Sequence, residues 1–309
     1  MNVDKLSFKI LNQEPGIDGI YKAAELPGRI CYGSMDKMTN DSAKPFVERL
    51  MNSNHGAPLE HGAVYLILPE ALIDDYEVFF RENPYSKITY FNDKLYVSTN
   101  LRVLFDNNML DLLEYVIGEP TIHHEKRVMV EFTANIGVTR EYNRHRHDSI
   151  NEESTRYCNY SKDKYSNQIN IIENYKFYDR EEEFNSKLNR SFNEWIKWIS
   201  NGADNFNDID YWLFANSASE WSYMGLINKC GWKQQDARDV LLLDTKSSLI
   251  HTAFISDWCN FFNLRALGTT GAPHPQAKEI AYPLMEEFIK LGYVKIEEVD
   301  GKKYCIENK

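Results

Sequence analysis

The sequence predicts an α+β protein folded as a single domain. Short apolar runs that favour strands occur in the first half of the chain, whereas apolar residues repeat every three or four positions through the second half. The 309 residues contain no internal repeat and no Pro- or Gly-rich linker that would divide them. A chain of this length can bury a substantial core as one unit.

Helix and strand signals alternate in the first half. A helix is expected after Asp41, because Phe46, Val47, Leu50 and Met51 recur on one helical face. A second helix is expected at residues 109–117. Strands are expected where short β-prone runs occur, at residues 64–68, 95–97, 101–104 and 128–132.

The second half is predicted to be mainly helical. Apolar residues from Phe184 to Ile199 follow a helical repeat and predict one amphipathic helix. The most apolar stretch, residues 247–264, has Asp257 as its single charge and is expected to be a buried helix, since its Ser, Thr, Asn and His residues argue against a membrane span. The pair Asp300-Gly301 predicts a terminal β-hairpin. Further helices are expected at residues 211–227, 234–243, 248–264 and 276–291.

Composition excludes several classes of protein. The chain has 35 basic and 46 acidic residues and a net charge of −11, which argues against a surface that binds nucleic acid or anionic lipid. Its five cysteines are far apart and form no Cys-x-x-Cys pair, so neither a disulfide framework nor a thiolate zinc site is expected. The N-terminus shows no secretion signal. We therefore expect a cytoplasmic protein with no membrane or nucleic-acid partner.

Residues 140–160 carry the clearest chemical signal. This acidic chain places four arginines here, at positions 140, 144, 146 and 156, among Ser, Thr and Asn side chains. Guanidinium groups bind phosphate oxygens bidentately, and hydroxyl groups satisfy the remaining lone pairs. The segment therefore indicates an anion site for a nucleotide, although a solvated basic surface is the simpler reading of a charge run.

Three alternatives remain open at this point. A metal site at His145 and His147 is disfavoured, because the flanking arginines repel a cation and neither a His-Glu-x-x-His spacing nor a carboxylate triad accompanies the histidines. A hydrolase could use His145 as its base. A nucleotide- or RNA-binding protein without catalysis could use Tyr142, Tyr157 and Tyr160 as stacking platforms. No glycine-rich nucleotide loop is present.

The motif spacing resembles that of the flavin-dependent thymidylate synthases. Arg144-His145-Arg146, seven residues and then Ser154 match the family signature, and Asn151-Glu152-x-Ser154-x-Arg156-Tyr157 continues it. His55-Gly-Ala-Pro-Leu-Glu-His61 and Asn260-Phe-Phe-Asn-Leu-Arg265 resemble two further family segments in the same order. The resemblance covers residues 20–68 and 128–285. Residues 69–127 are then expected to be an insertion, and residues 292–307 a C-terminal extension.

The resemblance implies a compact protomer with a central sheet and packed helices, assembled as a homotetramer with active sites at subunit interfaces. It also implies an NADPH-oxidising methyltransferase that reductively methylates dUMP to dTMP. Methylenetetrahydrofolate would be the one-carbon donor, and FAD reduced by NADPH the hydride source.

The resemblance also implies roles for individual residues. Arg265 would be catalytic, lying against the uracil and polarising it. The residues expected to bind FAD are His55, Arg144, His145, Arg146, Glu152 and Asn260. Those expected to bind dUMP are Arg144, Glu152, Ser154, Thr155, Arg156, Arg238 and Arg265. The chain departs from the family pattern at Phe254 and Ser256, where some members place an Asn and an Arg near FAD.

Overall fold

A computed structural model describes residues 1–202 and 205–308. The contacts within the chain divide it into two compact units, which are described separately. Unit 1 comprises Met1–Ser7, Thr133–Glu141 and Ser154–Ser247, and unit 2 comprises Phe8–Phe132, Tyr142–Glu153 and Ser248–Lys309. Helices and strands are mixed along the chain, which confirms the predicted combination of α and β structure.

A four-stranded sheet forms the centre of unit 2. Its strands are ordered β2-β6-β9-β7, and β7 pairs antiparallel with β9 so that Ser149 lies opposite Thr252. The side chains of β6 and β9 are buried on both faces of the sheet along most of their length. The strands are β2 (Ser7–Leu11), β6 (Arg127–Asn135), β7 (Ser149–Glu152) and β9 (Lys246–Phe254).

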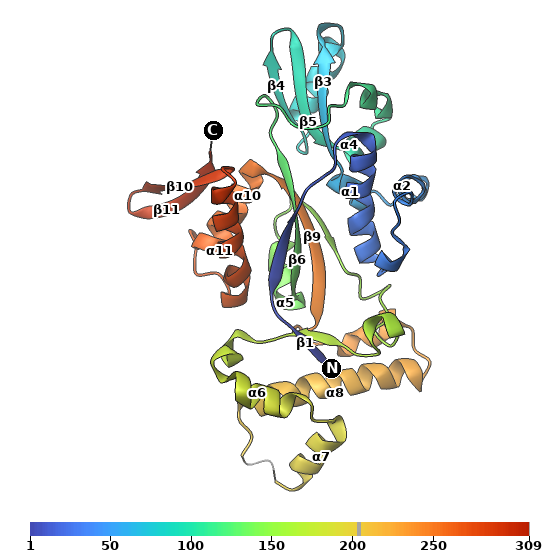
Figure 1. The fold of residues 1–309 in the computed structure, drawn as a ribbon, viewed down its shortest axis with the longest axis vertical. Coiled ribbons are helices and arrows are strands. Elements are labelled where there is room, and N and C mark those ends of the chain that lie inside the picture. The colour runs from blue at the N-terminus through green and yellow to red at the C-terminus, as the bar shows by residue number, and fades with distance from the viewer. Residues whose placement is uncertain (203–204, 309) are drawn as a thin grey trace. The chain divides into compact units, whose positions relative to one another are not determined.

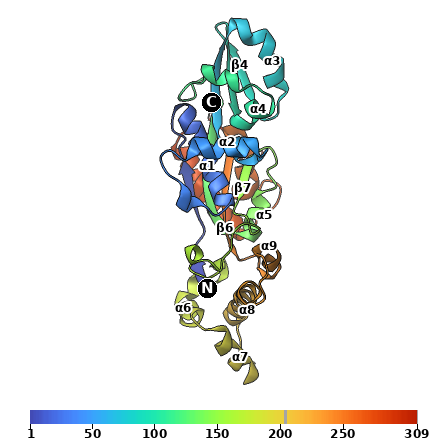
Figure 2. The same cartoon turned by 90° about the vertical axis from the view of Figure 1, so that its right-hand side faces the viewer.

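Helices cover both sides of this sheet (Figures 1 and 2). On one side lie α1 (Gly16–Cys31) and α2 (Ala43–Asn52), and on the other lie α10 (Ile255–Phe262) and α11 (Pro275–Lys290). Aromatic side chains fill the space between β6, β9, α10 and α11, and the edge of the Tyr142 ring packs against Phe132 and Phe261. The Tyr142 hydroxyl donates to the Ala277 carbonyl at 2.7 Å, so the start of the motif segment is anchored in this core.

A second, three-stranded sheet in unit 2 has the order β3-β5-β4. The strands are β3 (Ala63–Pro69), β4 (Lys87–Phe91) and β5 (Lys94–Asn100), and the adjoining helices are α3 (Ile73–Glu82) and α4 (Leu101–Asp106). The strand predicted at residues 101–104 is wrong, because the Asn100 side chain accepts from the Val103 amide at 3.1 Å and caps a helix there. The helix predicted at residues 109–117 is a 3₁₀ helix, Leu110–Tyr115.

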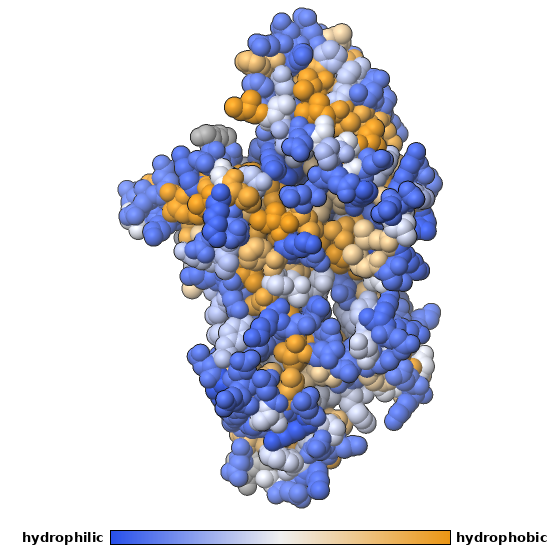
Figure 3. Space-filling view, in the orientation of Figure 1, coloured by the Kyte–Doolittle hydropathy of each residue, from blue (hydrophilic) through white to orange (hydrophobic). Residues whose placement is uncertain are grey.

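The predicted terminal hairpin is confirmed as β10 (Val294–Val299) and β11 (Lys302–Glu307). Asp300 and Gly301 have positive φ values of 51° and 72°, as a two-residue hairpin turn requires. The Asn263 side chain exchanges two hydrogen bonds with the backbone of Cys305, so the hairpin is fixed to the end of α10. Figure 3 shows hydrophobic surface over this hairpin and over the three-stranded sheet.

Unit 1 is mostly helical. Its strands β1 (Asn2–Asp4) and β8 (Asn170–Ile172) pair in parallel. The single helix predicted from Phe184 to Ile199 is two helices, because Ser191 and Glu194 form a capping box that starts the second. The helices are α6 (Glu181–Leu188), α7 (Phe192–Ser200), α8 (Asp208–Asn228) and α9 (Gln234–Ala237). The helix expected at residues 234–243 therefore ends early and continues as the 3₁₀ helix Arg238–Val240.

The helix predicted at residues 248–264 is wrong in its first half. Residues up to Phe254 belong to β9, and α10 begins only at Ile255. A strand buried on both faces lacks the alternation of apolar and polar residues, so periodicity alone cannot distinguish its sequence from that of a buried helix. In the described part of the chain, no helix is long and apolar enough to cross a membrane. The helix α5 (Ile136–Tyr142) follows β6 along the chain, and its residues up to Glu141 belong to unit 1. The remaining 3₁₀ helices are Met35–Lys37, Ala57–His61, Glu70–Leu72, Asp163–Tyr165 and Tyr175–Arg180.

Candidate anion-binding site

The predicted site residues are shared between the two units. Unit 2 carries the signature turn, together with His55, Glu152, Asn260 and Arg265, and unit 1 carries Ser154, Thr155, Arg156 and Arg238. Each group is described within its own unit.

In unit 2, the signature turn presents its arginines to solvent and buries its histidine. His145 is 7% exposed, whereas Arg144 and Arg146 on either side are exposed. The His145 amide donates to the Tyr142 carbonyl at 3.1 Å, which closes the turn. Within residues 1–202 and 205–308, no carboxylate lies within 4.0 Å of either arginine, so their guanidinium groups can receive an anion.

His145 contacts Arg265, which lies 120 residues further along the chain. The Arg265 Nε donates to His145 Nε2 at 3.3 Å, so Nε2 must be an acceptor and the ring proton lies on Nδ1. Burial, followed by the nearby His251 ring, lowers the pKa of His145 to about 4, although Asp148 works in the opposite direction. His145 is therefore neutral at pH 7. Two separate family segments of the sequence thus meet in one place.

Arg265 lies in the π-helix Asn263–Leu267, which continues α10 and ends at Gly268 with a positive φ of 69°. Such wide turns are rare and occur frequently at functional sites. The π-helical turn is a feature that the sequence analysis did not predict.

Asp148 and His251 form a buried pair that the sequence analysis also missed. The carboxylate Oδ2 of Asp148 lies 2.6 Å from His251 Nε2, and both side chains are almost fully buried. His251 is on β9, so this pair ties the signature turn to the central sheet. No local pattern indicates a contact between residues 103 positions apart.

The other predicted residues of unit 2 have local partners. The Tyr32 hydroxyl hydrogen bonds to His55 Nδ1, and Asn143 donates to Glu152 Oε2 at 3.0 Å. Asn260 is exposed on α10. In the described part of the chain, no hydrogen bond or ion pair joins His55 or Asn260 to the arginines of the turn.

The two residues at which the chain departs from the family pattern, Phe254 and Ser256, both have partners within unit 2. Ser256 hydrogen bonds to the Glu125 carboxylate, and Phe254 is buried beneath the Arg127 guanidinium.

In unit 1, Ser154, Thr155 and Arg156 form a second arginine-bearing turn. The Ser154 hydroxyl accepts from the Arg156 amide at 3.3 Å, and Arg238 donates to Thr155 Oγ1 at 3.4 Å. Arg156 and Arg238 are exposed, and no described carboxylate lies within 4.0 Å of them. The Arg238 guanidinium therefore lies beside the Thr155 hydroxyl, and the Arg156 guanidinium lies over the Tyr157 ring at 5.6 Å.

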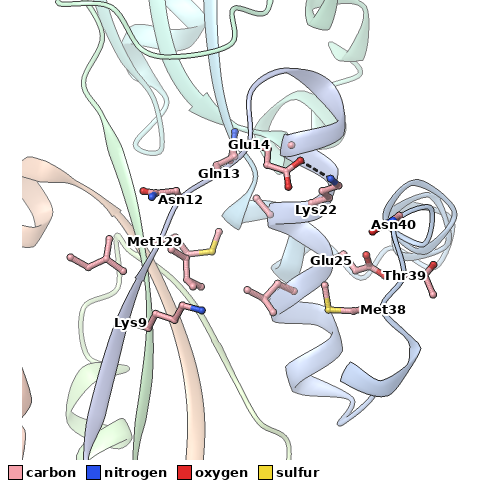
Figure 4. Close-up of a pocket in the computed structure, with 15 residues that line it drawn as sticks. Lys9, Asn12, Gln13, Glu14, Lys22, Glu25, Met38, Thr39, Asn40 and Met129 are labelled. Atoms are coloured by element: carbon pink, nitrogen blue, oxygen red, sulfur yellow. Dashed lines mark hydrogen bonds and ion pairs between the residues drawn. The ribbon is translucent and has the colours of Figure 1, made fainter.

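Several alternative sites find little support. Of the three tyrosines suggested as stacking platforms, Tyr142 and Tyr160 are buried, and Tyr157 alone is exposed. Among the described residues, no three His, Cys, Asp or Glu side chains are arranged to hold a metal ion. A pocket of about 610 Å³ between β2 and α1 (Figure 4) contains none of the predicted residues. Its Lys22 and Glu14 are paired with each other at 2.5 Å.

The chain has mixed α and β structure, and two of its turns present exposed arginines. The family model described as thymidylate synthase complementing protein matches residues 107–291, which is more than half of the chain. The chain therefore belongs to this family, the flavin-dependent thymidylate synthases, and is placed among methyltransferases. The match includes both arginine-bearing turns, Arg238, Asn260 and Arg265, and it leaves His55 outside.

Similar solved structures include two of a UMP/dUMP methylase, PolB from Streptomyces cacaoi, one bound with 5-Br dUMP and the other with 5-Br UMP. Each is 15% identical to this chain with a TM-score of 0.41 and covers 94% of it, and the match spans 93% and 92% of the respective relatives. No curated protein matches this chain.

Proposed function

We propose that this protein is a flavin-dependent thymidylate synthase that reductively methylates dUMP to dTMP. Methylenetetrahydrofolate is the proposed one-carbon donor, and NADPH the proposed reductant of FAD. The observation that carries the proposal is the contact between Arg265 and His145, because it joins the signature turn to the predicted catalytic arginine. Family membership is its independent support.

Unit 2 offers groups that suit FAD. The diphosphate of FAD needs cations that are not already neutralised, and the exposed Arg144 and Arg146 meet that need. His145, His55, Glu152 and Asn260 complete the proposed flavin-binding set. FAD, when bound and reduced, supplies the hydride. The protein's own contribution is to bind and orient the reactants.

The nucleotide is assigned to the second arginine-bearing turn and its neighbours. Arg156 and Arg238 are proposed to neutralise the dUMP phosphate, with Ser154 and Thr155 donating hydrogen bonds. Arg144 and Glu152 are proposed to contact the nucleoside.

Arg265 is the proposed catalytic residue. Its guanidinium is proposed to stabilise negative charge on a uracil oxygen, which polarises the ring for its attack on the methylene carbon. Neutral His145 accepts from Nε of Arg265 and so orients the guanidinium without competing for its charge.

The proposal extends to assembly and organisation. We propose a cytoplasmic homotetramer with active sites at subunit interfaces and no nucleic-acid or membrane partner. We also propose that residues 1–309 form a single domain, in which residues 69–127 are an insertion and residues 292–307 a C-terminal extension.

Flavin binding and turnover test the function. Purified protein should show flavin absorbance or bind added FAD, and its reduced flavin should be oxidised only when dUMP and methylenetetrahydrofolate are both present. Formation of dTMP would be measured by chromatography. A protein that binds dUMP but neither binds flavin nor forms dTMP would instead be a nucleotide-binding protein without catalysis.

A further inference from the structure

A second polar pocket lies in unit 2, away from every residue assigned above to FAD or dUMP. It has a volume of about 350 Å³, within the range of small-molecule sites. Residues of β2 and β6, the start of β3 and Thr252 of β9 form its walls. The residues that can interact with a charged ligand are His61, Tyr65, Lys126, Arg127, Thr252 and Tyr293.

The pocket contains a buried arginine without a counterion. Arg127 donates to the Glu60 carbonyl and to the Ser149 hydroxyl, each at 2.8 Å, and its Nε has no hydrogen-bond partner. It is 7% exposed. No described carboxylate lies within 4.0 Å of its nitrogens, and Glu60, Asp148 and Asp257 act on it only at longer range. The guanidinium carbon also lies 5.3 Å from the centroid of the Phe254 ring, within the range of a cation–π contact.

His61 adds a donor beside Arg127. Its Nδ1 lies 2.8 Å from Thr252 Oγ1, its Nε2 has no hydrogen-bond partner within 3.5 Å, and the Asn151 side chain is close enough to interact with the ring. Burial, then the charges of Arg127 and His251, lowers the pKa of His61 to about 3, against the opposing effect of Asn151, so the ring is neutral. When the Thr252 hydroxyl donates to Nδ1, the ring proton lies on Nε2.

Lys126 supplies a second cation to the same pocket. Its Nζ donates to the Tyr293 hydroxyl at 2.8 Å and lies 4.8 Å from the centre of that ring. Glu119 also lines the pocket but is exposed. The pocket therefore combines two cations with a neutral donor and has one carboxylate at its solvent-exposed edge.

A buried charge destabilises a fold unless it is paired, and buried polar donors are almost always hydrogen bonded. Here the pocket wall carries a guanidinium that has no described carboxylate paired with it and whose Nε has no hydrogen-bond partner, together with His61 and Lys126. An oxyanion bound in the pocket would neutralise the arginine charge and accept hydrogen bonds from its guanidinium.

We propose that this pocket binds the oxyanion group of a small molecule, a phosphate or a carboxylate, against Arg127, His61 and Lys126. Tyr65 and Tyr293 then flank the body of the ligand. The site is separate from the proposed nucleotide and flavin groups, so it does not depend on the proposed function.

Inorganic phosphate and acetate are the probes. Each is titrated by calorimetry at constant ionic strength into protein carrying Arg144→Ala, Arg146→Ala and Arg156→Ala, which weaken anion binding at both arginine-bearing turns. One of the two anions should bind with a single-site isotherm. Adding Arg127→Gln should lower that affinity about tenfold or more, because a charge-assisted hydrogen bond is lost. Adding Arg81→Gln, at an exposed arginine of the same unit, should leave it unchanged.

Locating the anion in crystals tests the proposal even if the Arg127→Gln variant does not fold. Crystals of the unaltered protein soaked in bromide should show an anomalous peak beside Arg127, and Lys126→Gln should weaken binding of the anion. Phosphate binding without acetate binding identifies a phosphate site, and the reverse a carboxylate site. The proposal is overturned if neither anion binds, if the pocket shows no bromide, or if Arg127→Gln and Lys126→Gln both fold and bind as tightly as their parent. Turnover of dUMP, measured in parallel, reports separately on the proposed function.

Discussion

The Asp148 carboxylate and the His251 imidazole lie 2.6 Å apart in the interior of unit 2. Asp148 closes the turn that carries Arg144, His145 and Arg146, and His251 sits on β9 with its ring centroid 4.3 Å from that of Trp258. The pair therefore fixes an exposed, arginine-rich turn to the rigid centre of the sheet. Ligand-binding side chains need such support, because a loosely held guanidinium loses affinity to conformational entropy.

Asp148→Asn tests this support. The variant keeps the shape of the side chain but removes the charge facing His251, and we expect the free energy of unfolding in urea to fall by about 1–3 kcal/mol. FAD affinity should fall too, because the turn is held less firmly. His147→Asn, at the exposed neighbouring residue, is the matched control and should change neither quantity. Equal stability of the two variants would show that the pair does not hold the turn.

Stability should decrease in mild acid. The pKa values of His145 and His61 are lowered to about 4 and about 3, against about 6.5 in the unfolded chain. The unfolded state therefore binds more protons, and stability present above pH 6.5 is lost as the pH falls toward 4 and then 3. At pH 5 each of the two histidines should lower the free energy of unfolding by about 2 kcal/mol relative to pH 7.

Urea unfolding from pH 7 to pH 5 measures this effect. His145→Gln should reduce the loss by about half, because one of the two titrations is removed. The control His147→Gln changes an exposed ring and should leave the loss as it is. A flat stability profile between pH 7 and pH 5 would contradict the burial of both rings.

Glu25→Gln should destabilise unit 2 strongly. Arg29 donates through Nε and a terminal nitrogen to Glu25 Oε1 at 2.9 and 2.8 Å, and both side chains are buried on α1. Removing one charge from a buried pair leaves the other uncompensated and costs about 3–5 kcal/mol. Glu77→Gln breaks an exposed Arg81–Glu77 pair of the same helical spacing and should cost under about 0.5 kcal/mol. The prediction is wrong if urea unfolding shows that both variants lose the same free energy of unfolding.

The sequence predicts the fold best where the signal is local. The helix at residues 211–227 appears as α8, and Asp300-Gly301 turns the hairpin as expected. Prediction fails where tertiary contacts decide. The run from Ser248 to Phe254 is apolar because β9 is covered on both faces, and nothing within the run itself distinguishes that strand from a buried helix.

The same limit applies to the candidate site. The family resemblance indicates Arg144, Arg156 and Arg265 individually, because each stands at a position of a family motif in this sequence. It does not indicate Asp148–His251 or the unpaired Arg127, since each depends on strands that meet only after folding. Side chains that only support a site follow no motif in a single sequence. The side chains proposed to bind ligand, in contrast, stand in recognisable motifs.

Arg265→Lys should separate binding from turnover. Lysine keeps the positive charge but loses the planar fork and the Nε that contacts His145. We expect dUMP affinity to fall less than about tenfold and the rate of dUMP-dependent flavin oxidation to fall by about two orders of magnitude or more. Single-turnover oxidation with saturating dUMP measures the rate. A normal rate in this variant would remove Arg265 from the chemical step.

Cys158 offers the last test, because a thiolate beside Arg156 could attack the uracil ring as a covalent nucleophile. Its side chain, however, is fully buried in a cluster with Tyr160, Tyr223 and Ala237, and its amide donates to the Ser154 carbonyl at 2.8 Å. A nucleophile has to reach its substrate, and this sulfur is enclosed by its own unit. Cys158→Ser, with or without Cys31→Ser, should therefore keep dUMP-dependent flavin oxidation within about tenfold of the parent.

Cys158→Ala is the matched variant for this comparison, since it removes the sulfur without placing a hydroxyl group in an apolar cluster. Both variants should bind dUMP and flavin as the parent does, and Cys158→Ser should be the less stable because its hydroxyl is buried there. The decisive measurement is single-turnover oxidation of reduced enzyme with saturating dUMP and methylenetetrahydrofolate. If both variants lost several orders of magnitude in rate while binding both ligands normally, Cys158 would be the nucleophile. If both variants retain flavin oxidation, hydride transfer proceeds without a covalent enzyme–substrate bond. The role of Cys158 is then to pack against the second arginine-bearing turn.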